Sequence, residues 1–181
     1  MWIQYYFDKF SFNILCLSIA AGVVILSGCG TVERKVTFDK NYSVSAGTRV
    51  ELGAVKNKTG IEFDVDVEKM LHDALTESLK AKDLYSTGGI DPKLVLSANI
   101  VGYAKGNAFE RWASVSFSTV GRGSTALEIE ATLYDAQNRQ VGTATARRTV
   151  DFGGGFTIGA WKRIYTNVAD DVVDKLAEQL K

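Results

Sequence analysis

Residues 127–134, Leu127-Glu128-Ile129-Glu130-Ala131-Thr132-Leu133-Tyr134, decide the fold. Apolar residues occupy every second position, and acidic residues, threonine or tyrosine fill the positions between them. This period of two is typical of a β-strand that turns one face to a core and the other to solvent. The segment therefore predicts a sheet that is covered on one side.

The same reasoning places further strands and two helices around this segment. Strands are predicted near Val50–Ala54, Leu94–Ile100, Ala113–Phe117 and Gln140–Val150, and a short one near Val36 and Phe38. The first helix carries an apolar stripe at three- and four-residue spacing, and Asp64 or Asp66 is its expected N-cap. The stripe comprises Val67, Met70, Leu71, Ala74, Leu75, Ser78 and Leu79. The second helix presents Trp161, Ile164, Val168, Val172, Leu176 and Leu180 on one side.

The order of these elements gives the fold class. A strand and a helix come first, a run of antiparallel strands follows, and a helix closes the chain. Two amphipathic helices on one face of a mainly antiparallel sheet of about five strands form a two-layer α+β domain.

The N-terminal segment predicts an export signal. Residues 14–26 carry no charge and number thirteen, which is the length of a secretory apolar region and too short for a transmembrane helix. Leu26-Ser27-Gly28-Cys29 follows and resembles the bacterial lipoprotein box. The resemblance implies cleavage between Gly28 and Cys29 and attachment of acyl chains to the Cys29 sulfur. An uncleaved transmembrane anchor is the alternative.

These features divide the chain into three parts: a lipoprotein signal peptide at 1–28, a lipidated N-terminus and tether at 29–48, and a single periplasmic domain at 49–181. The 21 basic residues balance the 21 acidic residues, so the charge gives no reason to expect a nucleic-acid partner. The only other cysteine, Cys16, lies in the signal, so the mature domain is predicted to have no disulfide.

Sequence motifs that suggest catalysis or cofactors fail on their context. The glycine pattern at 121–126 precedes a strand rather than the helix that a dinucleotide site needs. An EF-hand starting at Asp64 would meet Lys69 and Leu75 where glycine and glutamate are required. His72 is the only histidine and is predicted to be solvated. We therefore expect no catalytic residue, no cofactor and no metal ion, and the sequence identifies no small-molecule ligand.

Two clusters of arginine and tryptophan suggest contact with another protein. Arg111-Trp112 and Trp161-Lys162-Arg163 combine residue types that are favoured in interfaces. Inward packing of Trp161 is an equally good account of the second cluster. Arg111 and Trp112 are the candidate partner surface.

A loose series of turn and strand motifs resembles a bacterial lipoprotein family known as domain of unknown function 4410. The family usually has glycine in the turn where this chain has Asn138-Arg139, and asparagine can adopt the same left-handed backbone. The resemblance implies an envelope lipoprotein and brings no catalytic residue. It rests on Leu96, Gly106-Asn107, Arg111, Gly121-Arg122-Gly123, Leu127-Glu128-Ile129, Leu133-Tyr134-Asp135-Ala136, the glycines at 153–155, Ala169 and Leu176.

Three functional hypotheses follow. The first is a non-enzymatic envelope lipoprotein, anchored through Cys29, that acts as a binding or assembly component. Gly30 favours the outer membrane, facing the periplasm, over the inner membrane, which an aspartate at that position would favour. The second is an accessory subunit of an envelope transport or secretion complex, and the third is a hydrolase whose site the sequence does not reveal.

Overall fold

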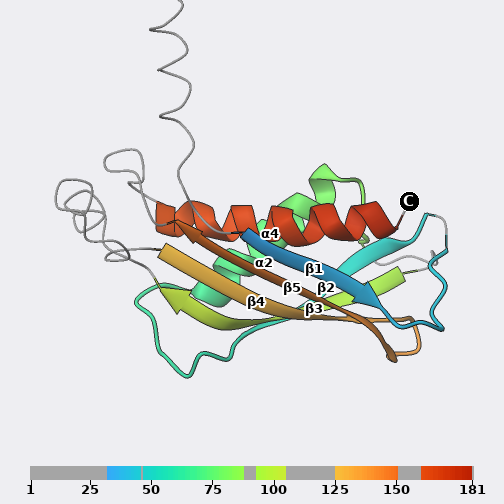
Figure 1. Cartoon of the computed structure of the whole chain (residues 1–181), viewed down its shortest axis with the longest axis horizontal. Coiled ribbons are helices and arrows are strands. Elements are labelled where there is room, and N and C mark those ends of the chain that lie inside the picture. The colour runs from blue at the N-terminus through green and yellow to red at the C-terminus, as the bar shows by residue number, and fades with distance from the viewer. Residues whose placement is uncertain (1–31, 46, 88–92, 105–124, 151–159, 181) are drawn as a thin grey trace, which may run out of the picture.

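The structure is a computed structural model that describes residues 32–45, 47–87, 93–104, 125–150 and 160–180. It has two layers, a five-stranded sheet and two helices packed against it (Figure 1). The elements in chain order are β1 (Val32–Phe38), β2 (Arg49–Asn57), α2 (Val67–Ala81), β3 (Lys93–Ala104), β4 (Thr125–Tyr134), β5 (Gln140–Val150) and α4 (Ala160–Gln179). The predicted α+β class is confirmed.

The sheet has the strand order β1-β5-β4-β3-β2, so β1 and β2 are its two edges. Neighbouring strands are antiparallel except β2 and β3, which run parallel because α2 connects them as a crossover helix. The predicted strand over 127–134 lies in β4, at the centre of the sheet.

The two faces of the sheet differ as the alternation in β4 predicts. Leu127, Ile129 and Leu133 are fully buried under the helices, whereas Glu130 on the other face is exposed. Neighbouring strands place small residues side by side: Ala98 pairs with Ala131, and Ala131 with Ala144. Because these alanine side chains are small, the helices can pack close to the sheet along this row.

Both helices contribute an apolar stripe to the core. Asp66 caps α2, and its side chain accepts a hydrogen bond from the Lys69 N–H at 2.8 Å, which settles the choice between Asp64 and Asp66. The buried stripe of α2 consists of Val67, Leu71, Leu75, Ser78 and Leu79. The stripe of α4 consists of Ile164, Tyr165, Val168, Ala169, Val172, Val173 and Leu176, followed by Leu180.

The segment 29–48, which the sequence analysis assigned to a tether, contains a complete edge strand. The expected short strand near Val36 and Phe38 extends over Val32–Phe38, and all seven residues pair with β5. Val36 is buried in the core, and Phe38 packs against it. The sequence predicts only part of the strand, because Glu33, Arg34 and Lys35 are polar and a strand with one buried side chain shows little alternation. Residues 32–38 therefore belong to the sheet and not to a tether.

The β4–β5 turn behaves as the sequence suggested. Asn138 has a φ of +58°, the left-handed conformation that the resemblance to domain of unknown function 4410 led us to expect. The Asp135 carboxylate closes the turn by accepting hydrogen bonds from the N–H groups of Gln137 and Arg139, both at 2.9 Å. The predicted strand at 113–117 and the glycines at 153–155 lie outside the described residues.

The alternation in β4 can be tested with two neighbouring substitutions. Ile129→Ala should lower the free energy of unfolding by roughly 2–5 kcal/mol, because it removes a fully buried side chain and leaves a cavity. Glu130→Ala, on the exposed face, should change it by less than about 0.5 kcal/mol. Urea denaturation followed by circular dichroism measures both. Equal losses in the two variants would contradict the assignment of the faces.

Candidate functional site

The site residues proposed from the sequence, Gly28, Cys29, Arg111 and Trp112, lie outside the described residues. His72 is half-exposed and lies 3.8 Å from Asp73, which confirms that it is solvated. Within the described ranges, no three histidine, cysteine or acidic side chains lie close enough to hold a metal ion. In the same ranges, no helix combines the length and the apolar character needed to cross a membrane.

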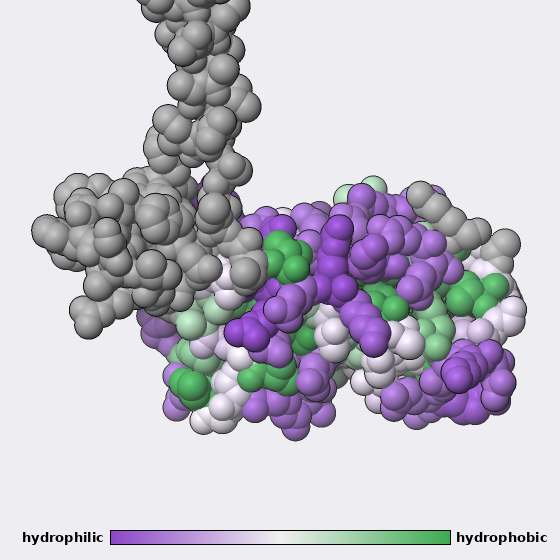
Figure 2. Space-filling view, in the orientation of Figure 1, coloured by the Kyte–Doolittle hydropathy of each residue, from purple (hydrophilic) through white to green (hydrophobic). Residues whose placement is uncertain are grey.

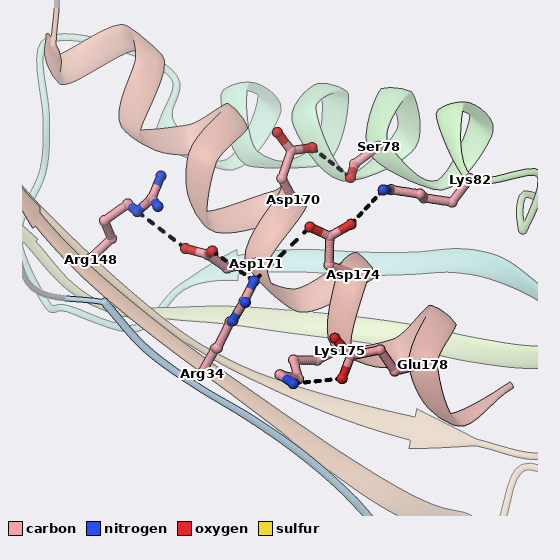
Figure 3. A network of polar contacts seen from close by, with 9 residues as sticks. All are labelled: Arg34, Ser78, Lys82, Arg148, Asp170, Asp171, Asp174, Lys175 and Glu178. Atoms are coloured by element: carbon pink, nitrogen blue, oxygen red, sulfur yellow. Dashed lines mark hydrogen bonds and ion pairs between the residues drawn. The ribbon is translucent and has the colours of Figure 1, made fainter. Parts of the chain in front are cut away.

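The most distinctive polar feature is a buried carboxylate between two arginines. Asp171 of α4 has a side chain that is only 7% exposed. Arg34 Nη1 of β1 lies 3.3 Å from Asp171 Oδ1, and Arg148 Nε of β5 lies 3.2 Å from Oδ2 (Figure 3). We call Arg34, Arg148 and Asp171 the Asp171 cluster. It joins three elements that are far apart in the sequence.

The electrostatics of the cluster reflect burial. Loss of water raises the pKa of the Asp171 carboxyl above its usual value. Arg148 and Arg34 act in the opposite direction, while the nearby Asp174 and Asp170 raise the pKa further. The two arginines are partly exposed and keep access to water. The buried carboxylate is therefore the member that depends on its partners.

A second set of contacts joins the two helices next to the cluster. Ser78 Oγ donates a hydrogen bond to Asp170 at 2.8 Å, and Lys82 Nζ lies 2.7 Å from Asp174 (Figure 3). Both pairs advance by four residues in the same direction, so α2 and α4 run parallel to each other. Asp174 also lies 4.0 Å from Arg34, which connects this set to the Asp171 cluster.

An open groove of about 610 Å³ follows the line between α2 and α4. Met70, Ala74 and Tyr165 supply apolar lining, and Asp73, Glu77 and Lys162 supply charge. Asp73 pairs with Lys69 and Glu77 with Lys80, so two of these carboxylates are engaged in exposed ion pairs. Ser78 and Asp170 also line the groove, and their hydrogen bond joins α2 to α4.

The two edges of the sheet are protected differently. On β2, the Val50 N–H donates to Leu84 O and Val50 O accepts from the Ser86 N–H, while the Asn57 N–H donates to Glu68. On β1, the carbonyl of Val36 accepts a hydrogen bond from Gln179 of α4 at 3.0 Å. Charged side chains on an edge strand oppose uncontrolled pairing with other chains, and β1 carries three in a row, Glu33, Arg34 and Lys35.

Sequence reasoning missed the Asp171 cluster, although one signal was present. Asp171 falls between Val168 and Val172 on the apolar side of the predicted second helix. A carboxylate in that position needs a cationic partner. Nothing in the sequence indicates that Arg34 and Arg148, more than a hundred residues apart, are those partners.

The exposed surface shows no broad apolar area on the face seen in Figure 2. Hydrophilic residues dominate this face, and hydrophobic residues form small, separated areas. Single exposed apolar residues are ordinary on a protein surface.

Comparison with protein-family models and with curated proteins finds no match. Solved structures do match. The fold is similar to that of PelC. PelC from Paraburkholderia phytofirmans, crystallised as a dodecamer, superposes with a TM-score of 0.57 at 16% identity, covering 84% of this chain and 99% of PelC. A point variant of the same dodecamer gives 0.54 at 16% identity, covering 82% of this chain and 98% of that chain.

Protein XCC0632 from Xanthomonas campestris, of the DUF330 family, gives a TM-score of 0.48 at 13% identity, covering 80% of this chain and 93% of that one. At 16% identity, the likeness to PelC is a likeness of fold. The resemblance to domain of unknown function 4410 stays a prediction, because no family model matches.

Asp171→Asn should remove a pH-dependent part of the stability. The folded-state pKa of Asp171 lies above its ordinary 3.8, so the stability associated with its protonated form is present at low pH and lost as the pH rises through the folded-state pKa. The free energy of unfolding of the wild type, relative to the asparagine variant, should therefore fall as the pH rises from about 4 towards neutrality.

Urea titrations of both proteins across this range measure the difference. Asp174→Asn is the matched control, because it removes a more exposed carboxylate from the same helix. If the free energy of unfolding of the wild type, relative to the Asp171→Asn variant, increased as the pH rises, the raised pKa of Asp171 would be contradicted.

Proposed function

We propose that this chain is a bacterial envelope lipoprotein, anchored through acylated Cys29, whose domain acts as a non-catalytic assembly component. The observation that carries the proposal is the lipoprotein box Leu26-Ser27-Gly28-Cys29, placed directly before a domain with the fold of PelC. Residues 1–28 are then the signal peptide. Because Val32–Phe38 form strand β1, we count these residues with the domain and not with the lipidated segment that the sequence analysis placed at 29–48.

Attachment to the membrane follows from the chemistry of the anchor. A buried methylene contributes about 0.8 kcal/mol, and one acyl chain gives only reversible binding, whereas two or three chains hold a protein stably. Gly30 supports location in the outer membrane with the domain facing the periplasm. The balanced charge of the chain adds no electrostatic drive of its own.

An assembly role is supported by the fold and by the character of the surface. PelC shares the fold and was crystallised as a dodecamer. The groove between α2 and α4 combines apolar residues with paired charges. We infer that the chain forms a homo-oligomer, and that the oligomer is its working form.

A role as an accessory subunit of an envelope transport or secretion complex is the second candidate. It is compatible with the same anchor and the same fold. The exposed edge of β1 and the residues Arg111 and Trp112 are where such a partner would be sought.

Cys29→Ala should abolish lipidation and cleavage. The expected result is loss of the acyl-modified N-terminal peptide and accumulation of the uncleaved precursor, because the thiol is the acceptor. Mass spectrometry of the protein purified from its native envelope measures this directly. Cys16→Ala is the matched control and should be processed normally, since Cys16 lies within the apolar region of the signal. An unacylated wild-type N-terminus would overturn the anchor.

The oligomer can be tested on the acylated wild-type protein extracted in detergent. Native mass spectrometry should give one discrete species containing many copies. A monomer at every accessible concentration would reject the homo-oligomer while leaving the anchor untouched.

A further inference from the structure

The N-terminal end of β1 lies close in sequence to Cys29, the predicted site of lipid attachment. Two residues, Gly30 and Thr31, separate Cys29 from Val32, the first residue of β1, so three Cα–Cα steps lie between them. At about 3.3–3.6 Å per residue, they span at most about 10 Å. With Cys29 acylated, as the proposed function requires, Val32 therefore lies close to the lipid headgroups.

Strand register identifies which residues share that level. Val32 pairs with Arg148, Arg148 with Leu127, and Leu127 with Tyr103, so these four residues form one row across β1, β5, β4 and β3. The Tyr103 ring contacts Phe63 at 4.9 Å between centroids and Tyr165 at 5.5 Å. Phe63, in the loop after β2, and Tyr165, in the early part of α4, therefore lie at the same end of the sheet as Val32.

Helix α4 runs in the same direction as β1 and extends past it. Arg34 contacts Asp171, and Val36 contacts Gln179. Trp161 lies ten residues before Asp171, about 15 Å along the helix axis, whereas Val32 lies only about 7 Å before Arg34 along its strand. The first turn of α4 thus reaches beyond Val32, on the side where the chain enters the sheet (Figure 1).

We call this end of the domain, with Val32, residues 58–63 and residues 161–163, the Val32 end. Among the described residues, the large hydrophobic side chains that are exposed are Ile61, at 54%, and Val32, at 43%. Both lie at this end. Two hydrogen bonds hold the backbone of the loop at Ile61. Asn57 Nδ2 donates to the Ile61 carbonyl at 2.8 Å, and the Ile61 N–H donates to Thr59 Oγ1.

The same end carries residue types that suit a membrane surface. Lys162 Nζ lies 5.2 Å from the centre of the Trp161 ring, and Lys162, Arg163 and Lys58 are exposed. Tryptophan is favoured at the boundary between lipid and water, and lysine and arginine are attracted to anionic headgroups. The acidic residues at this end, Glu33, Glu62 and Asp64, reduce that attraction, so the apolar contacts matter more.

We propose that the Val32 end rests on the phospholipid surface, with Val32, Ile61 and Trp161 reaching the headgroup region. The inference rests on the lipidation of Cys29 and adds to it a fixed orientation. The opposite end, with Lys40 and the β4–β5 turn, then points away from the membrane. The lipid and the contact surface together form a two-part anchor.

The mature chain offers a clean way to test this orientation. Cys29 is its only cysteine, and transfer of a diacylglyceryl group to the Cys29 sulfur forms a thioether that no longer reacts with thiol reagents. A single introduced cysteine can therefore carry a nitroxide spin label alone. Ile61→Cys reports on the Val32 end, and Lys40→Cys, also exposed, is the matched control at the opposite end.

The experiment uses the full mature lipoprotein in vesicles of phosphatidylethanolamine and phosphatidylglycerol. The label at position 61 should be several-fold less accessible to a water-soluble nickel relaxant and more accessible to oxygen than the label at position 40. Equal accessibility at the two positions would overturn the proposed orientation. Dipolar broadening between labels at position 61, without added oxygen access, would mean that a second copy covers this end and would overturn it too.

Labelling of the parent protein, which has no introduced cysteine, tests the lipid anchor separately from the orientation. The parent should take up no label, because its sulfur carries the diacylglyceryl group. Uptake of label by the parent would reject the lipid anchor itself. An unlabelled parent with equal accessibility at positions 61 and 40 would reject only the orientation.

Discussion

A carboxylate with little access to water lies between helix α4 and the sheet and constrains how the two layers meet. Asp171 lies between Arg34 on the edge strand and Arg148 on its neighbour, and burial of the carboxyl makes it depend on these two cations. The apolar contacts of α4 supply most of the stabilising area, but they are not directional. The ion pairs are directional, and they fix how β1 and β5 lie under the helix.

This arrangement matters because β1 follows the predicted anchor almost immediately. Only one side chain of β1 is fully buried, so apolar burial alone holds it weakly. Pairing with β5, the Arg34–Asp171 contact and the Gln179–Val36 hydrogen bond together secure it. A force on the lipid would reach the domain through this strand. The proposed attachment site at Cys29 is thus only two residues from a strand of the sheet.

The likeness to PelC and the sequence signal support different parts of the proposed function. The lipoprotein box concerns where the chain is held, and it would mean the same in front of any exported domain. The likeness to PelC concerns the fold of the domain alone, and at 16% identity it shows no shared partner or role. The buried cluster and the apolar tips at the Val32 end come from neither source and belong to this structure.

The sequence by itself determined the α+β class, both helices and the N-cap at Asp66 to within two residues, because each depends on contacts within a few residues or on a local period. The left-handed Asn138 was expected from the resemblance to domain of unknown function 4410. Of β1, the sequence predicted only the part near Val36 and Phe38, since a strand with one buried side chain has a weak periodic signal. Only the tertiary structure brought Arg34 and Arg148 to Asp171 and placed Val32 and Ile61 at one end. Those arrangements depend on strand order and register, which join residues far apart in the chain and leave no mark in any short stretch of it.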